Sequence, residues 1–196
     1  MQADFAIELS NDDETLDFPW VDTDGRLLYY DLKRHPELLS QLPEVQTFPE
    51  LGGFLAAINS PKGILETAKS DAWASDEMNV EDEIFGAKWK FGSYVDVVFS
   101  EEVDRFSLEA HESLVKRAVT LLKKVPEIPA SIELLVRRCY FSVMSQTPSA
   151  DEGRSGFYIT SYVIGYGTDE TQARAQWAVA LKLLSNALLQ TTKQRS

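Results

Sequence analysis

The sequence predicts an α+β fold in which a curved antiparallel sheet carries two long amphipathic helices on one face. The main observation is a unit that occurs twice in the second half of the chain, an alternating apolar strand followed at once by a long helix. The first strand covers residues 90–99 and the second covers 156–166. Strands and helices in this order are typical of helices packed against one face of an antiparallel sheet.

The two helices have the clearest patterns. Ser107 is expected to cap the first helix and Pro126 to end it, while Thr168 or Asp169 is expected to cap the second. Apolar residues recur at the helical period in the first helix at Leu108, Leu114, Val115, Ala118, Leu121, Leu122 and Val125. They recur in the second helix at Ala173, Trp177, Ala180, Leu181, Leu184 and Leu188. We expect Trp177 to lie at the centre of the core.

Alternation of apolar residues indicates the strands. One face of the strand at 90–99 is expected to meet the helices through Trp89, Phe91, Val95, Val97 and Phe99. Between the helices, the apolar parity changes within one run, from Ile132, Leu134 and Val136 to Cys139, Phe141 and Val143. This change predicts a bulge or bend at Arg137–Arg138.

Residues 61–75 fit two structures. A helix is indicated by the spacing of Ile64, Leu65, Ala68, Ala72 and Trp73. A strand would present on one side Thr67, Lys69, Asp71 and Trp73. We favour the strand, because the strand that follows needs a partner in the sheet.

The N-terminal part predicts a β-hairpin and a short helix that extend the main body. The hairpin is expected to pair 16–21 with 26–30 around a turn at 22–25, and the short helix to cover 36–42. Thr47 and Glu50 then have the spacing of a capping box. No linker rich in Gly, Ser or Pro interrupts the pattern. We therefore expect one domain over 1–196, divided into an extension, a body and a tail at 1–46, 47–190 and 191–196.

Composition predicts a cytoplasmic globular protein. The chain has 196 residues, of which 44% are hydrophobic and 26% charged, as in ordinary globular domains. Its apolar runs are interrupted by charges too often to span a bilayer, and its first residues lack the basic start of a signal peptide. Cys139 is the only cysteine, so no disulfide can form within the chain.

The net charge of −12 is unevenly distributed along the chain. Residues 1–104 hold 23 acidic and 7 basic residues, whereas residues 105–196 hold 8 acidic and 12 basic ones. An acidic surface repels phosphate backbones, so we expect neither a nucleic acid nor a membrane as partner. A basic or amphipathic protein partner, or self-association, fits the charge better.

No motif predicts a cofactor, a metal site or a catalytic group. The segment from Asp22 to Gly25 resembles the Asp-x-Asp-Gly-Thr loop of haloacid-dehalogenase-like phosphatases, in which Asp22 and Asp24 would act beside magnesium. Arg26 replaces the threonine of that loop, and no series of parallel strands and helices follows. The same residues are good turn formers, so we interpret them as a hairpin turn. His35 and His111 do not have the spacing of metal ligands.

Two groups of residues form a candidate partner surface. Tyr158, Tyr162 and Tyr166 share one face of the last strand, which points away from the helices and must be covered by the N-terminal extension or by a partner. The second group is the acidic run Glu81, Asp82 and Glu83.

The predicted order of elements resembles that of the small acidic chaperones of bacterial secretion systems. The resemblance covers about residues 47–190 and is one of topology, with no shared motif. It implies a non-enzymatic protein-binding module such as a chaperone, adaptor or immunity protein. The other function that we retain is a small-molecule-binding or carboxylate-based hydrolytic domain, which two close carboxylates with raised pKa values would favour.

Overall fold

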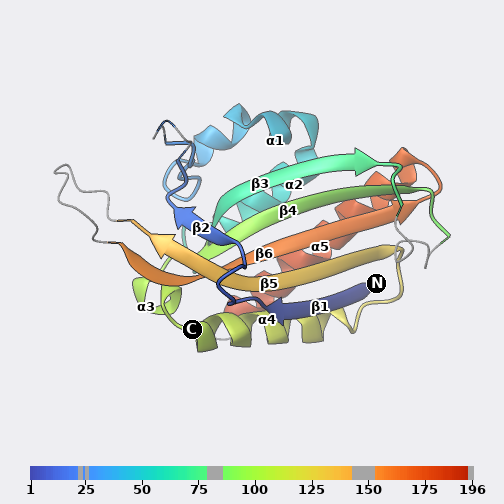
Figure 1. Ribbon diagram of the computed structural model, residues 1–196. Coiled ribbons are helices and arrows are strands. Elements are labelled where there is room, and N and C mark those ends of the chain that lie inside the picture. The colour runs from blue at the N-terminus through green and yellow to red at the C-terminus, as the bar shows by residue number, and fades with distance from the viewer. Residues whose placement is uncertain (22–23, 25–26, 79–85, 143–152, 194–196) are drawn as a thin grey trace.

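The computed structural model describes residues 1–21, 24, 27–78, 86–142 and 153–193, and it has an α+β fold (Figure 1). Its strands are β1 (Gln2–Ile7), β2 (Thr15–Phe18), β3 (Leu65–Ser75), β4 (Trp89–Phe99), β5 (Ala130–Phe141) and β6 (Arg154–Gly167). Its helices are η1 (Pro36–Gln41), α1 (Pro43–Thr47), α2 (Pro49–Ile58), α3 (Glu102–Arg105), α4 (Leu108–Leu122) and α5 (Glu170–Lys193).

Four long strands form an antiparallel sheet in the order β5-β6-β4-β3. The choice of a strand within 61–75 is therefore confirmed, because β3 pairs with β4 along its whole length. The prediction that Thr67 and Lys69 share a face is wrong, since the register between β3 and β4 shifts between them. This bulge lets Thr67 bond to Asn59, the residue that follows α2, while Lys69 lies on the opposite face of the sheet.

The predicted N-terminal hairpin is largely replaced by parallel pairing with β5. β1 pairs with the first half of β5 and β2 with its second half, so the two short strands follow one another along the same edge. Among the described residues of the predicted hairpin, an antiparallel bridge pairs Val21 with Leu27 and the backbone N–H of Leu28 donates to the carbonyl of Trp20, while Asp22 lies outside the described residues. The sheet is therefore mixed, with an antiparallel centre and a parallel edge.

Of the bulge or bend predicted at Arg137–Arg138, the bulge is absent, because β5 keeps a continuous register with β6 from Ala130 to Phe141, and the bend stays a prediction. What changes is the face that is buried. The early apolar residues of β5, such as Leu134, pack in the main core beneath the helices. Cys139 and Phe141 pack in a second cluster on the opposite face, together with Leu16, Phe18, Ala68, Val98 and Tyr158. Val143 lies outside the described residues.

The helices form the second layer, and both long helices are confirmed. The side chain of Ser107 accepts a hydrogen bond from the backbone N–H of Ala110, which caps α4. Trp177 of α5 is fully buried, and Gly165 of β6 lets the helix approach closely, since a Cβ there would lie 2.1 Å from the backbone nitrogen of Trp177. Figure 1 shows α5 along the far side of the sheet and β2 on the near side.

The predicted capping box at Thr47 and Glu50 is wrong. Thr47 ends α1 and donates its hydroxyl hydrogen bond to the carbonyl of Pro43. Glu50 instead makes a two-pronged ion pair with Arg174 of α5, with N···O distances of 2.8 and 3.1 Å. The pair lowers the pKa of the Glu50 carboxyl and connects α2 to α5.

Candidate functional site

A polar cavity of about 230 Å³ opens on the sheet face that the helices leave uncovered. The register of the sheet brings Lys69, Asp96 and Thr160 into one row across β3, β4 and β6, and Tyr94 and Tyr162 into the next. The cavity is lined by Glu14, Lys69, Tyr94, Asp96, Arg137, Thr160 and Tyr162. We call it the Asp96 pocket.

Asp96 is the most buried charged group in the wall of this pocket, with 5% of its surface exposed. Its Oδ1 accepts a hydrogen bond of 2.7 Å from the hydroxyl of Thr160. Among the described residues, none donates a hydrogen bond to Oδ2. Burial raises the pKa of Asp96 to about 6, and the bond from Thr160 offsets part of that rise. The pocket therefore contains a carboxylate with one oxygen held by the protein and one available to a ligand.

Arg137 lies on β5 at the side of the pocket and is held by two carboxylates. Its Nε donates to Glu8 at 2.7 Å and its Nη1 donates to Glu14 at 3.1 Å. Glu8 and Glu14 stand at the two ends of the loop that separates β1 from β2. The interruption of the edge strand is thus what carries Glu14 to the pocket, and the charge of Arg137 is largely neutralised before any ligand binds.

Lys69 stands at the other side of the pocket, against aromatic rings. Its ammonium nitrogen lies 4.7 Å from the ring centroid of Trp20 and 5.8 Å from that of Tyr94. The rings of Tyr94 and Tyr162 pack at 6.3 Å between centroids. Burial, followed by the charge of Asp96, raises the pKa of Tyr94, so its hydroxyl stays a hydrogen-bond donor at neutral pH.

The predicted partner surface is only partly exposed. Tyr158 is buried in the second cluster beneath β2, and Tyr166 is buried with its hydroxyl 3.1 Å from that of Ser131. Tyr162 is half-buried and lines the Asp96 pocket. The three acidic residues Glu81, Asp82 and Glu83 lie outside the described residues.

Sequence reasoning missed the residues that do meet in the pocket. Asp96 interrupts an otherwise apolar run between Val95 and Val97, and a charge in a buried strand is a signal that could have identified it. Lys69 and Arg137 carried no such signal, because only the bulge in β3 and the pairing of β5 with β6 bring them to the same face.

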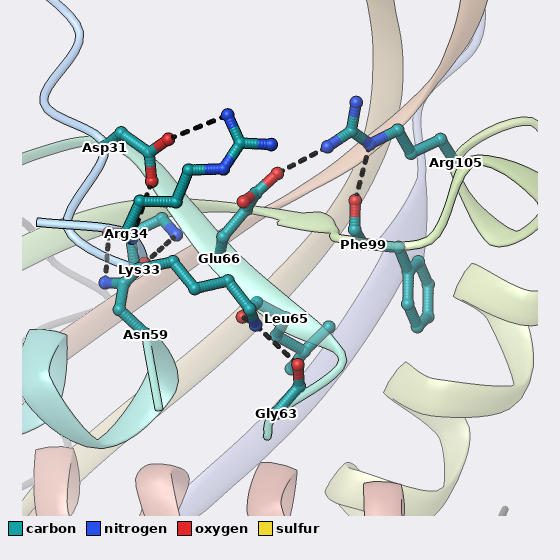
Figure 2. Close-up of polar contacts among 10 residues, drawn as sticks. Asp31, Lys33, Arg34, Asn59, Gly63, Leu65, Glu66, Phe99 and Arg105 are labelled. Carbon is teal, nitrogen blue, oxygen red and sulfur yellow. Dashed lines mark hydrogen bonds and ion pairs between the residues drawn. The ribbon is translucent and has the colours of Figure 1, made fainter. Parts of the chain in front are cut away.

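A second buried carboxylate, Glu66, lies one strand away and is satisfied by the protein (Figure 2). Its Oε1 accepts a hydrogen bond of 2.6 Å from Arg105, which also donates 2.7 Å to the carbonyl of Phe99. Lys33 donates to the carbonyls of Gly63 and Leu65 beside it. Burial raises the pKa of Glu66, while the charge of Arg105 lowers it. These contacts attach the N-terminal segment to β3, and we call this group the Glu66 cluster.

Comparisons with protein-family models, with curated proteins and with solved structures found no match to this chain. The topological resemblance to secretion chaperones therefore stays a prediction. Within the part of the chain that the structure describes, no helix is long and apolar enough to cross a membrane, and no group of His, Cys, Asp and Glu side chains could hold a metal ion.

Proposed function

We propose that this protein is a cytoplasmic, non-enzymatic binding domain that holds a small polar ligand in the Asp96 pocket. The observation that supports this function best is the carboxylate of Asp96, which is almost fully buried, faces a cavity and has one oxygen without a hydrogen bond from the described residues. Burial of a charge that no cation contacts by a hydrogen bond is costly, and such groups are concentrated at functional sites.

The dimensions of the pocket favour a small ligand. Its volume of about 230 Å³ is below the ~300–1,000 Å³ of sites for drug-sized molecules. Its wall combines charged groups, a hydroxyl and two tyrosine rings, which can orient a polar molecule through several contacts. The sequence favoured a protein-binding module instead, because the pocket depends on strand pairing that the sequence does not reveal.

The test is a ligand screen by thermal shift and by NMR, with small polar compounds that carry positive, negative or no charge. We expect compounds that raise the melting temperature of the wild-type protein and of Asp76→Asn, but not that of Asp96→Asn. Asp76 is exposed on the surface, so its variant controls for the chemical change alone. Compounds that stabilise all three proteins equally bind elsewhere, and that result would contradict the proposal.

A second candidate function is the protein-binding module, and one observation favours it. The helices α2 and α5 enclose a largely apolar groove of about 580 Å³, at which Val179 is 47% exposed although it is apolar. An amphipathic, basic segment of a protein partner fits both this groove and the acidic N-terminal half, and a nucleic acid fits neither.

This candidate makes its own prediction. A Val179→Glu variant should lose the partner, or should abolish self-association measured by sedimentation, without a change at the Asp96 pocket. Neutralising Glu81, Asp82 and Glu83 should mainly slow association, and added salt should do the same. Binding that ignores both salt and Val179 would refute this candidate.

A further inference from the structure

The charge around the Asp96 pocket is negative. Asp96 and Glu14 line it, Glu8 contacts Arg137, Asp71 lies opposite Tyr94 in the sheet, and Glu133 lies opposite Tyr162. In the wall itself two carboxylates, Asp96 and Glu14, balance two cations, Lys69 and Arg137, so the negative excess comes from the three carboxylates around the wall. A pocket with this balance attracts a positively charged ligand.

The two cations of the wall do not leave a good site for an anion. The guanidinium of Arg137 already donates to two carboxylates. The ammonium of Lys69 lies against the rings of Trp20 and Tyr94, at distances typical of cation–π contacts. An ammonium group thus already lies against Tyr94, one of the two rings that line the pocket, which is the contact that a cationic ligand would make.

The geometry points to a small primary amine as the ligand, with its ammonium bound to Oδ2 of Asp96 and its carbon atoms against the rings of Tyr94 and Tyr162. This inference rests on the proposed function and names its ligand class. A carboxylate accepts the N–H donors of an ammonium ion with charge-assisted hydrogen bonds. Thr160 occupies Oδ1, so Oδ2 is the oxygen that is left for a ligand. The ammonium ion also compensates the buried carboxylate for the hydrogen bonds to water that it loses on burial.

Binding should depend on pH, because only ionised Asp96 attracts the ammonium group. The raised pKa of Asp96, about 6, means that roughly a tenth of the protein has this carboxylate ionised at pH 5, and almost all of it at pH 7.5. The apparent affinity should therefore fall about tenfold between pH 7.5 and pH 5. The groups that face Asp96 from the surrounding elements are Glu14, Lys69, Tyr94, Arg137, Cys139, Tyr158, Thr160 and Tyr162.

Three compounds with one skeleton test the inference by calorimetry: phenethylamine, 2-phenylethanol and 3-phenylpropionate. We expect the amine to bind at pH 7.5, the alcohol to bind at least about tenfold more weakly, and the carboxylate not to bind. Asp96→Asn should weaken binding of the amine roughly tenfold to a hundredfold, the loss expected for a hydrogen bond between charged groups. Asp76→Asn should leave it unchanged.

The outcomes separate this inference from the proposed function. If the alcohol or the carboxylate binds best and Asp96→Asn abolishes that binding, the pocket is a ligand site but the amine is wrong. If none of the three compounds binds, or if Asp96→Asn has no effect, the inference of an amine ligand is overturned, and the wider screen decides the function.

A Thr160→Val variant adds a measurement, the pH dependence of amine binding, that would not change if Thr160 had a purely structural role. It should raise the pH at which amine affinity falls by half, because it removes a bond that favours the ionised carboxylate.

Discussion

Asp96 and Glu66 are buried carboxylates on neighbouring strands of one sheet face, and their surroundings differ. Glu66 is 7% exposed and has the guanidinium of Arg105 at 2.6 Å. Asp96 is 5% exposed, and its one hydrogen bond within the described residues comes from the neutral hydroxyl of Thr160. Burial raises the pKa of both. The difference is therefore the partner, a cation of the protein in one case and an open cavity in the other.

This difference separates a structural charge from a candidate site. Around Glu66, ionic contacts hold chain segments together. Arg105 donates to Glu66 and to the carbonyl of Phe99, and Lys33 donates to the carbonyl of Leu65 beside Glu66. Around Asp96, the described residues provide one hydrogen bond from a neutral hydroxyl and no ion pair, and the pocket is left open to a ligand. A residue that lowers the stability of the folded state is expected where function requires it.

The largest effect is expected at the Glu66 cluster. An Arg105→Met variant leaves Glu66 buried without its cation, and we expect a loss of about 3–5 kcal/mol in the free energy of unfolding at pH 8. Denaturation with urea measures it. Arg154→Met is the control, because the pair of Arg154 with Glu102 is exposed and should contribute at most about 1 kcal/mol. Equal effects of the two variants would show that Glu66 does not need its cation.

At Asp96, the corresponding change should stabilise the protein. Its pKa in the folded state, about 6, is above the ordinary value of 3.8, so the folded state binds the proton more tightly than the unfolded chain. Stability from this group is therefore present at low pH and is lost as the pH rises towards 6 and above. Asp96→Asn removes that loss, and we expect a gain of about 2–3 kcal/mol at pH 8 that vanishes near pH 4.

Urea denaturation at the two pH values checks this prediction, with Asp76→Asn as the matched control. A loss of stability in Asp96→Asn at pH 8 would mean that Asp96 is paired in solution, and the contrast with Glu66 would disappear.

A smaller effect is expected from Thr160→Val. The variant removes the hydroxyl that donates to Asp96, and we expect a loss of about 1 kcal/mol at pH 8. The pKa of Asp96 should rise above 6, since a hydrogen bond to the ionised form is lost. NMR titration of the Asp96 carboxyl carbon measures the pKa. An unchanged midpoint would show that the bond from Thr160 does not affect the pKa of Asp96.

The smallest effect on stability is expected from Glu14→Gln. Glu14 is exposed, so its ion pair with Arg137 should contribute less than about 1 kcal/mol. Its charge raises the pKa of Asp96, whereas the charge of Arg137 lowers it. Removing Glu14 should therefore lower the pKa of Asp96, which the same NMR titration detects. A rise would show that Glu14 does not act on the pocket directly.

The secondary structure of the body could be predicted because its signals are local. The helical period and the caps identified α4 and α5, and alternation identified the face of β4 that carries Phe91 and Val95. The predictions were wrong where a segment distant in the sequence determines the strand pairing or the buried face. The alternation in β5 showed that Cys139 and Phe141 are buried, but it could not show that β2 buries them on the second face.

The candidate site depends on such distant pairing almost entirely. The sequence by itself determined the α+β class, the two long helices and the acidic N-terminal half, because each depends on composition or on residues within a few positions of one another. Only the tertiary structure decided that Glu14, Lys69, Asp96 and Arg137 surround one cavity. The physical reason is that register between strands, a bulge in β3 and a parallel edge on β5 place side chains, and none of these is a property of a single segment.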